Sequence, residues 1–289
     1  MTNGRVQATR RAASGPLPND AALTAPYRGS DDGCASMRGS WLVALVPRLA
    51  TAAFVLALPV LLLTTNVRIA AGEVRVYEAA VRRYGAAETT GLPLEELDRA
   101  SREIIAYFEN DAPVLRILVT VDGNETSLFG PRETQHMADV KRLMRAVFRA
   151  NEVALAFVLS YVALRYLWAK EAPLRRLAWE VLLSGALAAA VVVGVGAVVL
   201  VGFEGAWTAF HEVVFPNDLW RLDPARDRLI QMFPEPFWQD AALAVGLATL
   251  AELALLAAAA GAGLLLSRGR AEVEASLKAA AIPAAGESR

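Results

Sequence analysis

The chain has 289 residues, of which 55% are hydrophobic and 20% are charged, and its formal net charge is −1 at pH 7. Mean hydropathy is positive and the apolar residues are concentrated in long runs, so the composition predicts an integral membrane protein. A near-neutral charge without basic clusters among aromatic residues argues against nucleic acid as a partner. The single cysteine, Cys34, excludes an intrachain disulfide and a cysteine-based zinc site.

The first segments along the chain are a polar tail and an apolar run. Residues 1–40 are rich in Ala, Gly, Ser, Pro and Arg without apolar periodicity, which predicts a disordered tail. Residues 41–65 have the length needed to cross a hydrocarbon core. This run starts too late for an ordinary signal peptide and is not followed by a small-residue cleavage site, so we expect it to be the first transmembrane span.

Residues 66–146 are expected to form an extracytoplasmic insertion that ends in the start of a second long helix. Apolar residues at helical spacing predict two amphipathic helices, around residues 74–84 and 97–108. The β-branched segment 114–121, followed by an Asp-Gly pair, predicts a small hairpin. The insertion should therefore have a small α+β fold of its own.

The segment 130–168 is predicted to be one uninterrupted helix. It opens with Gly-Pro, which suits a helix start, and contains no further Gly or Pro. Its first half is polar, whereas residues 147–169 are apolar enough to form the second span. At helical spacing Glu133, His136 and Asp139 share a face. This face places a histidine, flanked by two carboxylates, just above the bilayer.

Two further apolar runs, residues 177–202 and 241–267, predict the third and fourth spans. Lys and Arg flank the inner ends of all four spans, including the connection 170–176, whereas the loop 203–240 contains three Arg among seven acidic residues. By the positive-inside rule, both termini, including the tail 268–289, should face the cytoplasm. The fold class is thus a mainly α membrane protein with four transmembrane helices, the α+β insertion between spans one and two, and an interfacial outer loop between spans three and four.

Both histidines of the chain, His136 and His211, fall on the predicted outer side, beside carboxylates. His211-Glu212 begins a zincin-like pattern, but Phe215 occupies the position of the second histidine, which excludes a metalloprotease helix. A metal bound by the two histidines and carboxylates is an alternative that no ligand spacing specifies. Structural roles are another alternative. A histidine acting as general base is the economical interpretation, because its unperturbed pKa lies near neutrality.

Two carboxylates are predicted to lie inside the membrane. Glu180 is near the inner end of span three, where we expect a structural ion pair with the basic connection. Glu252 falls midway along span four, which makes it a functional candidate by default. It could also be paired within the bundle, with Arg165 as the suggested partner, and it is left outside the predicted site.

Several short motifs in the two histidine-bearing segments resemble a bacterial family of four-span membrane proteins, that of the lipoprotein intramolecular transacylase. The motifs are Glu133-x-x-His136-Met137-x-Asp139-Val140-Lys141, Phe210-His211-Glu212, Asn217-Asp218-x-Trp220, Asp223-Pro224 and Pro234-Glu235. The likeness runs in order through residues 41–267. It implies an inner-membrane enzyme that moves an acyl chain of a diacylated lipoprotein, at the outer leaflet, from the sn-2 ester of the diacylglyceryl group to the α-amine of the N-terminal cysteine. The product would be the lyso-form, and neither a cofactor nor a metal is implied.

Transferred onto this chain, the resemblance implies His136 as the base and His211 as the second catalytic imidazole, although the two roles could be exchanged. Asp139 and Glu212 would orient the rings. The remaining residues of the implied site would bind the substrate, with Asn217 and Arg221 as oxyanion donors: Glu133, Asn217, Asp218, Trp220, Arg221 and Asp223. Two alternatives stay open, an acyl hydrolase with the same histidine pair and a non-enzymatic membrane protein whose outer domain recognises a partner.

Overall fold

The structure is a computed structural model that describes residues 32–121, 123–168 and 173–280. Most of the predicted N-terminal tail, the Asp of the predicted Asp-Gly turn, part of the basic connection and the end of the C-terminal tail lie outside these ranges, as does the side chain of Cys34. The chain divides after Val46 into two units. The first unit contributes the helical residues 32–46, and the side-chain contacts described below belong to the second.

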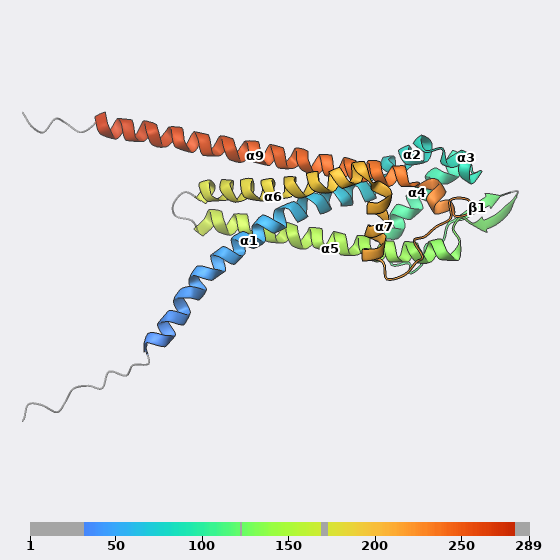
Figure 1. The fold of residues 1–289 in the computed structure, drawn as a ribbon, viewed down its shortest axis with the longest axis horizontal. Coiled ribbons are helices and arrows are strands. Elements are labelled where there is room, and N and C mark those ends of the chain that lie inside the picture. Colours follow the sequence, from blue (N-terminus) through green and yellow to red (C-terminus); the bar gives the residue numbers. More distant parts are fainter. Residues whose placement is uncertain (1–31, 122, 169–172, 281–289) are drawn as a thin grey trace, which may run out of the picture. The chain divides into compact units, whose positions relative to one another are not determined.

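Four helices are long and apolar enough to cross a membrane (Figure 1). They are α1 (Asp32–Gly72), α5 (Pro131–Trp168), α6 (Pro173–Val201) and α9 (Glu235–Ala280). The predicted uninterrupted helix after Gly130 is confirmed. The predicted disordered tail is wrong for residues 32–40, which are helical, and α9 continues through residues 268–280. Hydropathy marks the part of a helix that lies in lipid and not the point where its hydrogen bonds end.

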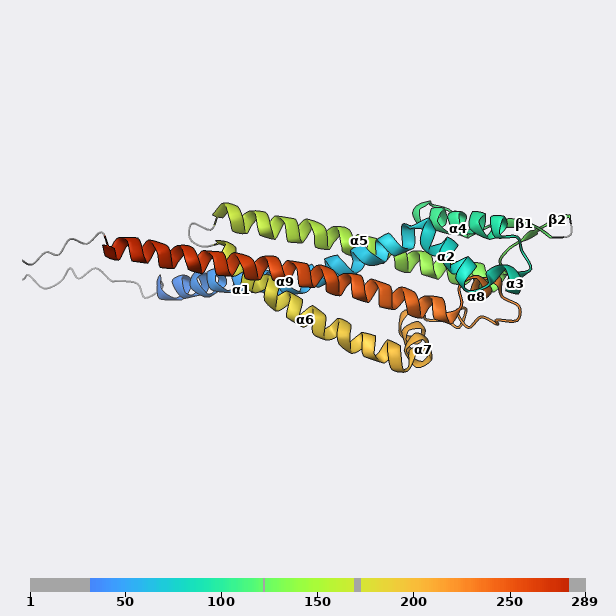
Figure 2. The ribbon, with the colours of Figure 1, turned by 90° about the horizontal axis from the view of Figure 1, so that it is seen from above.

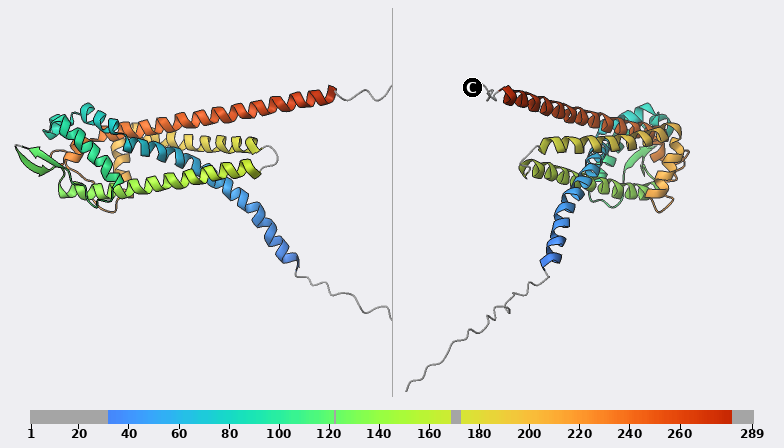
Figure 3. Two further views of the ribbon diagram at one scale, coloured as in Figure 1. Left: turned by 180° about the vertical axis from the view of Figure 1, so that it is seen from behind. Right: turned by 60° about the vertical axis from the view of Figure 1, so that its left-hand side comes forward.

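The long helices contact one another through apolar side chains, and α5, α6 and α9 run side by side in Figure 3. Phe54 of α1 stacks on Tyr161 of α5, with ring centroids 4.6 Å apart. Pro59 in α1 has no N–H to donate to the Val55 carbonyl four residues earlier. Ser184 of α6 is fully buried and donates to that carbonyl at 2.9 Å. A neighbouring helix thus replaces the missing backbone hydrogen bond, as a proline inside a membrane helix requires.

The two intramembrane carboxylates have different partners from those suggested by the sequence. Glu180 does form an ion pair, but its partner among the described residues is Arg165 of α5, and the Tyr161 hydroxyl donates to its other oxygen at 2.9 Å. Glu252 accepts a hydrogen bond from Asn66 Nδ2 at 3.0 Å. The suggested pairing of Glu252 with Arg165 is therefore wrong, because Arg165 is held by Glu180.

The insertion between α1 and α5 forms its own hydrophobic core. The two predicted amphipathic helices are present as α2 (Val74–Arg83) and α4 (Leu94–Glu109), and each buries one apolar face. A third helix, α3 (Ala86–Thr90), was not predicted, because five residues are too few to show a helical period. It lies between Gly85 and Gly91, whose positive φ angles of 65° and 68° suit glycine.

The predicted hairpin is present as β1 (Leu118–Val121) and β2 (Asn124–Ser127), which pair antiparallel. Gly123 in the turn has φ 79°, as expected for the Gly of a tight hairpin turn. The strand is shorter than the predicted segment 114–121. Its first residues instead enter the core of the insertion, where Leu115 and Ile117 are buried.

The predicted outer loop 203–240 is largely helical. It contains α7 (Phe203–Val214), which follows α6 almost directly, and the short α8 (Arg228–Met232), and it ends in the first residues of α9. Figure 2 shows α7 at the end of α6. Contacts of α6 with α7 and of α3 with α8 hold this segment against both the bundle and the insertion.

Candidate active site

His136 lies on the buried face of the first turns of α5. Glu133, His136 and Asp139 are only 2%, 7% and 8% exposed, so the predicted shared face exists and packs inward. The His136 ring meets the Phe215 ring edge to face, with centroids 5.2 Å apart. Its Nδ1 is buried without a hydrogen-bond partner among the described residues. Phe215 thus covers the imidazole on one side, and Nδ1 makes no polar contact within the described ranges.

His211 lies on the third turn of α7 and faces His136, with the two ring centroids 6.1 Å apart. Its Nδ1 is 2.8 Å from the backbone carbonyl of Trp207. A carbonyl only accepts, so Nδ1 must carry the proton and Nε2 must carry the lone pair in the neutral ring. Trp220 stacks on the ring at 4.8 Å, and Trp207 contacts it edge to face at 4.4 Å.

Both imidazoles are buried outside the apolar part of the bundle. α5 has 38 residues. At 1.5 Å per residue it is about 57 Å long, whereas a hydrocarbon core is about 30 Å thick, so the apolar half from Val147 suffices to cross it. Burial lowers the pKa of His136 to about 4; the nearby His211 also lowers it, and Asp139 raises it. Burial lowers the pKa of His211 as well, against the raising effect of the Trp207 hydrogen bond. Both rings are thus neutral near pH 7.

Asp139 is next to the histidines but does not hydrogen-bond to either of them. Its Oδ2 accepts from Asn217 Nδ2 at 2.9 Å, and its Oδ1 pairs with Arg142. Asn217 Oδ1 in turn accepts from the backbone N–H of Leu219 at 3.0 Å. The predicted orienting contact to an imidazole is thus absent from the described residues, and Asp139 instead fixes the loop after α7 to α5.

An exposed rim lies beside the two imidazoles. Arg221 contacts Glu212 at 3.3 Å and Asp218 at 3.0 Å, and its guanidinium lies 4.6 Å from the centre of the Trp220 ring. Trp220 thus has His211 and Arg221 as neighbours. Asp223 lies further along the exposed chain and accepts from the Ala225 N–H at 2.9 Å. Glu212, Asp218 and Arg221 belong to the rim, whereas Asp223 is separate from it.

Glu133 is tied to backbone groups. Its Oε2 accepts from the Gly130 N–H at 2.6 Å, as in the capping box of a helix start. Its Oε1 accepts from the Leu229 N–H in the first turn of α8 at 2.7 Å. Both carboxylate oxygens are therefore occupied by protein donors, which differs from the substrate-binding role implied by the sequence.

The next question is whether the described residues include a set of metal ligands. No group of three or more His, Cys, Asp or Glu there is arranged to hold an ion. The two imidazoles are neighbours, but the oxygens of Asp139 face Asn217 and Arg142.

Comparisons with known proteins place the chain in a family. The family model described as lipoprotein intramolecular transacylase Lit matches residues 52–238, well over half of the chain. The chain belongs to this family. The resemblance drawn from the histidine-bearing motifs is thereby confirmed.

Solved structures of the transacylase family have the same fold. The Lit structure from Bacillus cereus aligns with a TM-score of 0.65 at 19% identity, covering 78% of this chain and 99% of that one. A histidine-to-arginine variant of that protein aligns with a TM-score of 0.62 at 17% identity, covering 82% and 99%. Both are in meso structures of the membrane-integral protein. With four membrane-length helices, this family member is a multi-pass membrane protein of the predicted fold class.

A sequence relative covers a shorter stretch. An uncharacterized protein of Aquifex aeolicus (strain VF5) is 31% identical over 125 residues, which is 43% of this chain and 52% of that protein. The chain thus spans about half the length of the curated relative it matches.

Three residues at the candidate site were missed by the sequence reasoning. Trp207 fixes the proton of His211, and its position four residues earlier on the same helix was an available signal. Phe215 contacts both imidazoles, although it was considered only as a missing zinc ligand. Arg132 donates to the Asp218 and Leu219 carbonyls and holds the rim to α5, a contact between distant segments that no local pattern reveals.

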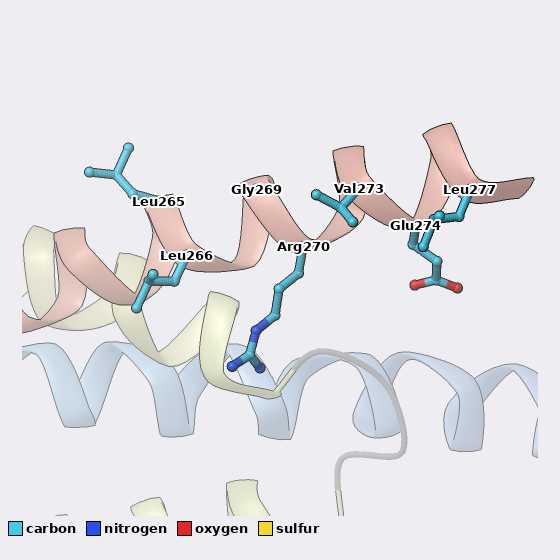
Figure 4. Close-up of a pocket in the computed structure, with 7 residues that line it drawn as sticks. All are labelled: Leu265, Leu266, Gly269, Arg270, Val273, Glu274 and Leu277. Atoms are coloured by element: carbon cyan, nitrogen blue, oxygen red, sulfur yellow. The ribbon is translucent and has the colours of Figure 1, made fainter. Parts of the chain in front are cut away.

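An apolar depression lies away from the two histidines. It lies along one face of α9 and is lined by Leu266, Arg270, Val273 and Leu277 among others (Figure 4). This face is formed by α9 alone and includes none of the residues described above. This depression is therefore separate from the facing imidazoles of α5 and α7.

Proposed function

We propose that this protein transfers an acyl chain, within one molecule of a diacylated lipoprotein, from the sn-2 ester of the diacylglyceryl group to the α-amine of the N-terminal cysteine. The observation that carries this proposal is the pair of buried, neutral imidazoles facing each other at 6.1 Å in a chain of the transacylase family. The product is the lyso-form lipoprotein. Neither a cofactor nor a metal is needed, because an ester is exchanged for a more stable amide.

His211 is the base in this proposal. The family resemblance had assigned that role to His136. The Trp207 carbonyl holds the proton on Nδ1, so the Nε2 lone pair is available to the attacking amine. As the amine nitrogen bonds to the ester carbonyl carbon, Nε2 takes its proton. When the bond from that carbon to the sn-2 oxygen breaks, the same proton passes to the leaving oxygen. The sum of the steps is neutral, and His211 returns to its starting state.

His136 supplies the second polar group. Its Nδ1 has no hydrogen-bond partner among the described residues, so we assign the lone pair of the neutral ring to that nitrogen. Nε2 then carries the proton and can donate it in a hydrogen bond to the ester oxygen as that oxygen becomes negative. Asn217 and Asp139 position the loop that carries Trp220. Arg221 belongs to the exposed rim, together with Glu212.

The site needs little further machinery. Amine and ester are on one molecule, and holding them in a reactive geometry can lower a barrier by roughly 7–11 kcal/mol compared with separate reactants. The rings of Trp207, Trp220 and Phe215 exclude water from the imidazoles. Exclusion of water favours transfer to the amine over hydrolysis.

We further propose that the protein lies in the bacterial inner membrane with both termini in the cytoplasm. Arg175 and Arg176 at the start of α6, and Arg268 and Arg270 in α9, flank the ends of the spans opposite to α7. The positive-inside rule assigns these ends to the cytoplasm. The two histidines then face the outer leaflet, where the lipidated cysteine of a lipoprotein is anchored.

The test is mass spectrometry of the N-terminal lipopeptide of a diacylated reporter lipoprotein after incubation with the purified protein. Wild type should move one acyl chain to the cysteine amine without a change in total mass. His211→Ala and His136→Ala should abolish this transfer. Gln135→Ala is the matched control, because Gln135 is exposed beside His136 on α5 and should retain full activity.

The same spectra separate the alternatives. Loss of the mass of one acyl chain would assign a hydrolase that uses water in place of the amine. An unmodified lipopeptide, with a folded wild-type protein in the membrane, would contradict the proposal and favour an interaction protein.

A further inference from the structure

In the hairpin of the insertion, the edge of β2 is open. The N–H of Leu128 donates to the Ile117 carbonyl at 2.8 Å, and Val119 pairs with Thr126. In an antiparallel pair, residues whose backbone groups face the partner strand alternate with residues whose groups face outward. The N–H and C=O groups of Glu125 and Ser127 therefore point away from β1.

The two edges of the hairpin differ. On the β1 side, Arg99 of α4 donates to the outward carbonyl of Leu118. On the β2 side, all four residues from Asn124 to Ser127 are exposed, and the backbone groups of Glu125 and Ser127 have no partner among the described residues. Such an edge is a template for pairing with another extended chain.

The open edge leads directly to the candidate active site. β2 ends at Ser127, and α5 begins four residues later, with His136 in its second turn. Four extended residues span at most about 13 Å, and five helical residues rise about 7.5 Å. The edge therefore lies within about 20 Å of the imidazoles along the chain. Figures 1 and 2 both show the hairpin beside the end of the molecule that holds the start of α5.

We propose that β2 binds, by strand addition, the extended peptide that follows the acylated cysteine of the lipoprotein. This inference rests on the proposed function, in which that cysteine lies at the two imidazoles and its peptide must lead away from the membrane. An extended chain advances about 3.3 Å per residue, so about six residues bridge the 20 Å to the edge. Main-chain hydrogen bonds give affinity without reading side chains, which suits an enzyme whose substrates share only the lipidated cysteine.

The test uses three diacylated lipopeptides of one sequence, with about twelve residues after the acylated cysteine. One is unmodified, and the other two carry N-methyl groups on the even or on the odd residues from position 4 to position 9. A peptide paired with β2 donates only alternate N–H groups to it. One methylated series should therefore show a KM raised by tenfold or more, since each lost hydrogen bond corresponds to about fivefold. The other series should keep the KM of the unmodified peptide, and kcat should be the same for all three.

The protein side of the same pairing is tested at Glu125. Glu125→Pro removes the outward N–H at an edge position that tolerates proline, whereas Glu125→Ala keeps that N–H and removes the side chain. Proline should raise the KM of the unmodified lipopeptide about fivefold, and alanine should leave it unchanged.

Each outcome decides the inference. Equal KM values for the two methylated series, with full acyl transfer, would overturn strand addition and leave the proposed function intact. If Glu125→Pro instead converted a dimer into a monomer with KM unchanged, the edge would belong to a second copy of the chain. No transfer from the unmodified lipopeptide would overturn both the function and this inference.

Discussion

Glu133 provides a sharp test of whether a buried carboxylate beside the site serves structure or substrate. Both of its oxygens accept backbone N–H groups, from Gly130 at 2.6 Å and from Leu229 at 2.7 Å, and the residue is 2% exposed. Glu133→Ala leaves two buried donors without acceptors. Each unsatisfied buried donor costs about 1–3 kcal/mol, so we expect unfolding to become easier by about 2–6 kcal/mol. Glu133→Gln keeps one acceptor oxygen and should cost about half as much.

The assay is denaturant unfolding in detergent, combined with the acyl-transfer rate of the fraction that stays folded. Glu212→Ala is the comparison for stability, because Glu212 is exposed and its ion pair with Arg221 is worth only about 0–1 kcal/mol. The Glu133→Ala protein should lose stability and keep its specific activity when folded. Full stability together with abolished transfer would refute this reasoning and would make Glu133 a substrate-binding residue.

Four further predictions concern other contacts. Because the chain has only two histidines, ¹⁵N-histidine NMR should resolve both rings. Burial lowers the pKa of both, so their titration midpoints should lie below 6.5, with one ring as the Nδ1–H tautomer. A midpoint above 6.5 would contradict the burial argument. As the pH falls below 6.5, the histidines of the unfolded chain bind protons while those of the folded protein stay neutral. The free energy of unfolding should therefore decrease as the pH falls from 6.5 towards 4. Asn217→Asp places a like charge 2.9 Å from Asp139, and should reduce stability by about 1.5–3 kcal/mol in thermal unfolding, whereas an unchanged transition would show that this contact does not hold the loop. Ser184→Ala should cost about 1–3 kcal/mol by denaturant unfolding, but almost nothing in a Pro59→Ala background, where residue 59 can donate to Val55 itself; equal costs in both backgrounds would contradict the compensation.

Much of the fold could be predicted because its determinants are local. Long apolar runs indicated four membrane helices, and the absence of Gly and Pro after Pro131 indicated that α5 is continuous. Apolar residues at helical spacing indicated α2 and α4, and the Asp-Gly pair indicated the hairpin. The helices inside the outer loop could not be predicted in this way. The aromatic-rich sequence of α7 was interpreted as part of an interfacial loop, and α8 has only five residues.

The placement of the two histidines was easier to predict than the contacts that each ring makes. Both histidines were predicted to lie on the outer side, and in the structure the rings of His136 and His211 face each other. The orientation of each ring depends on atoms that no spacing specifies, such as the Trp207 carbonyl and the Asn217 amide. For this reason the expected contact of the Asp139 carboxylate with an imidazole was wrong, and the carboxylate accepts a hydrogen bond from Asn217 instead.

The absence of a carboxylate contact among the described neighbours of the imidazoles has a chemical consequence. A carboxylate hydrogen-bonded to a histidine raises its pKa and stabilises the imidazolium, as in hydrolase triads. Here Asp139 is engaged by Arg142 and Asn217, and Glu212 is exposed beside Arg221, so the rings are surrounded mainly by Trp and Phe. Burial then keeps both imidazoles neutral. An attacking amine is most acidic once its nitrogen has bonded to the carbonyl carbon, and a neutral imidazole is basic enough to take the proton at that stage. The aromatic enclosure thus keeps the base free until the amine attacks.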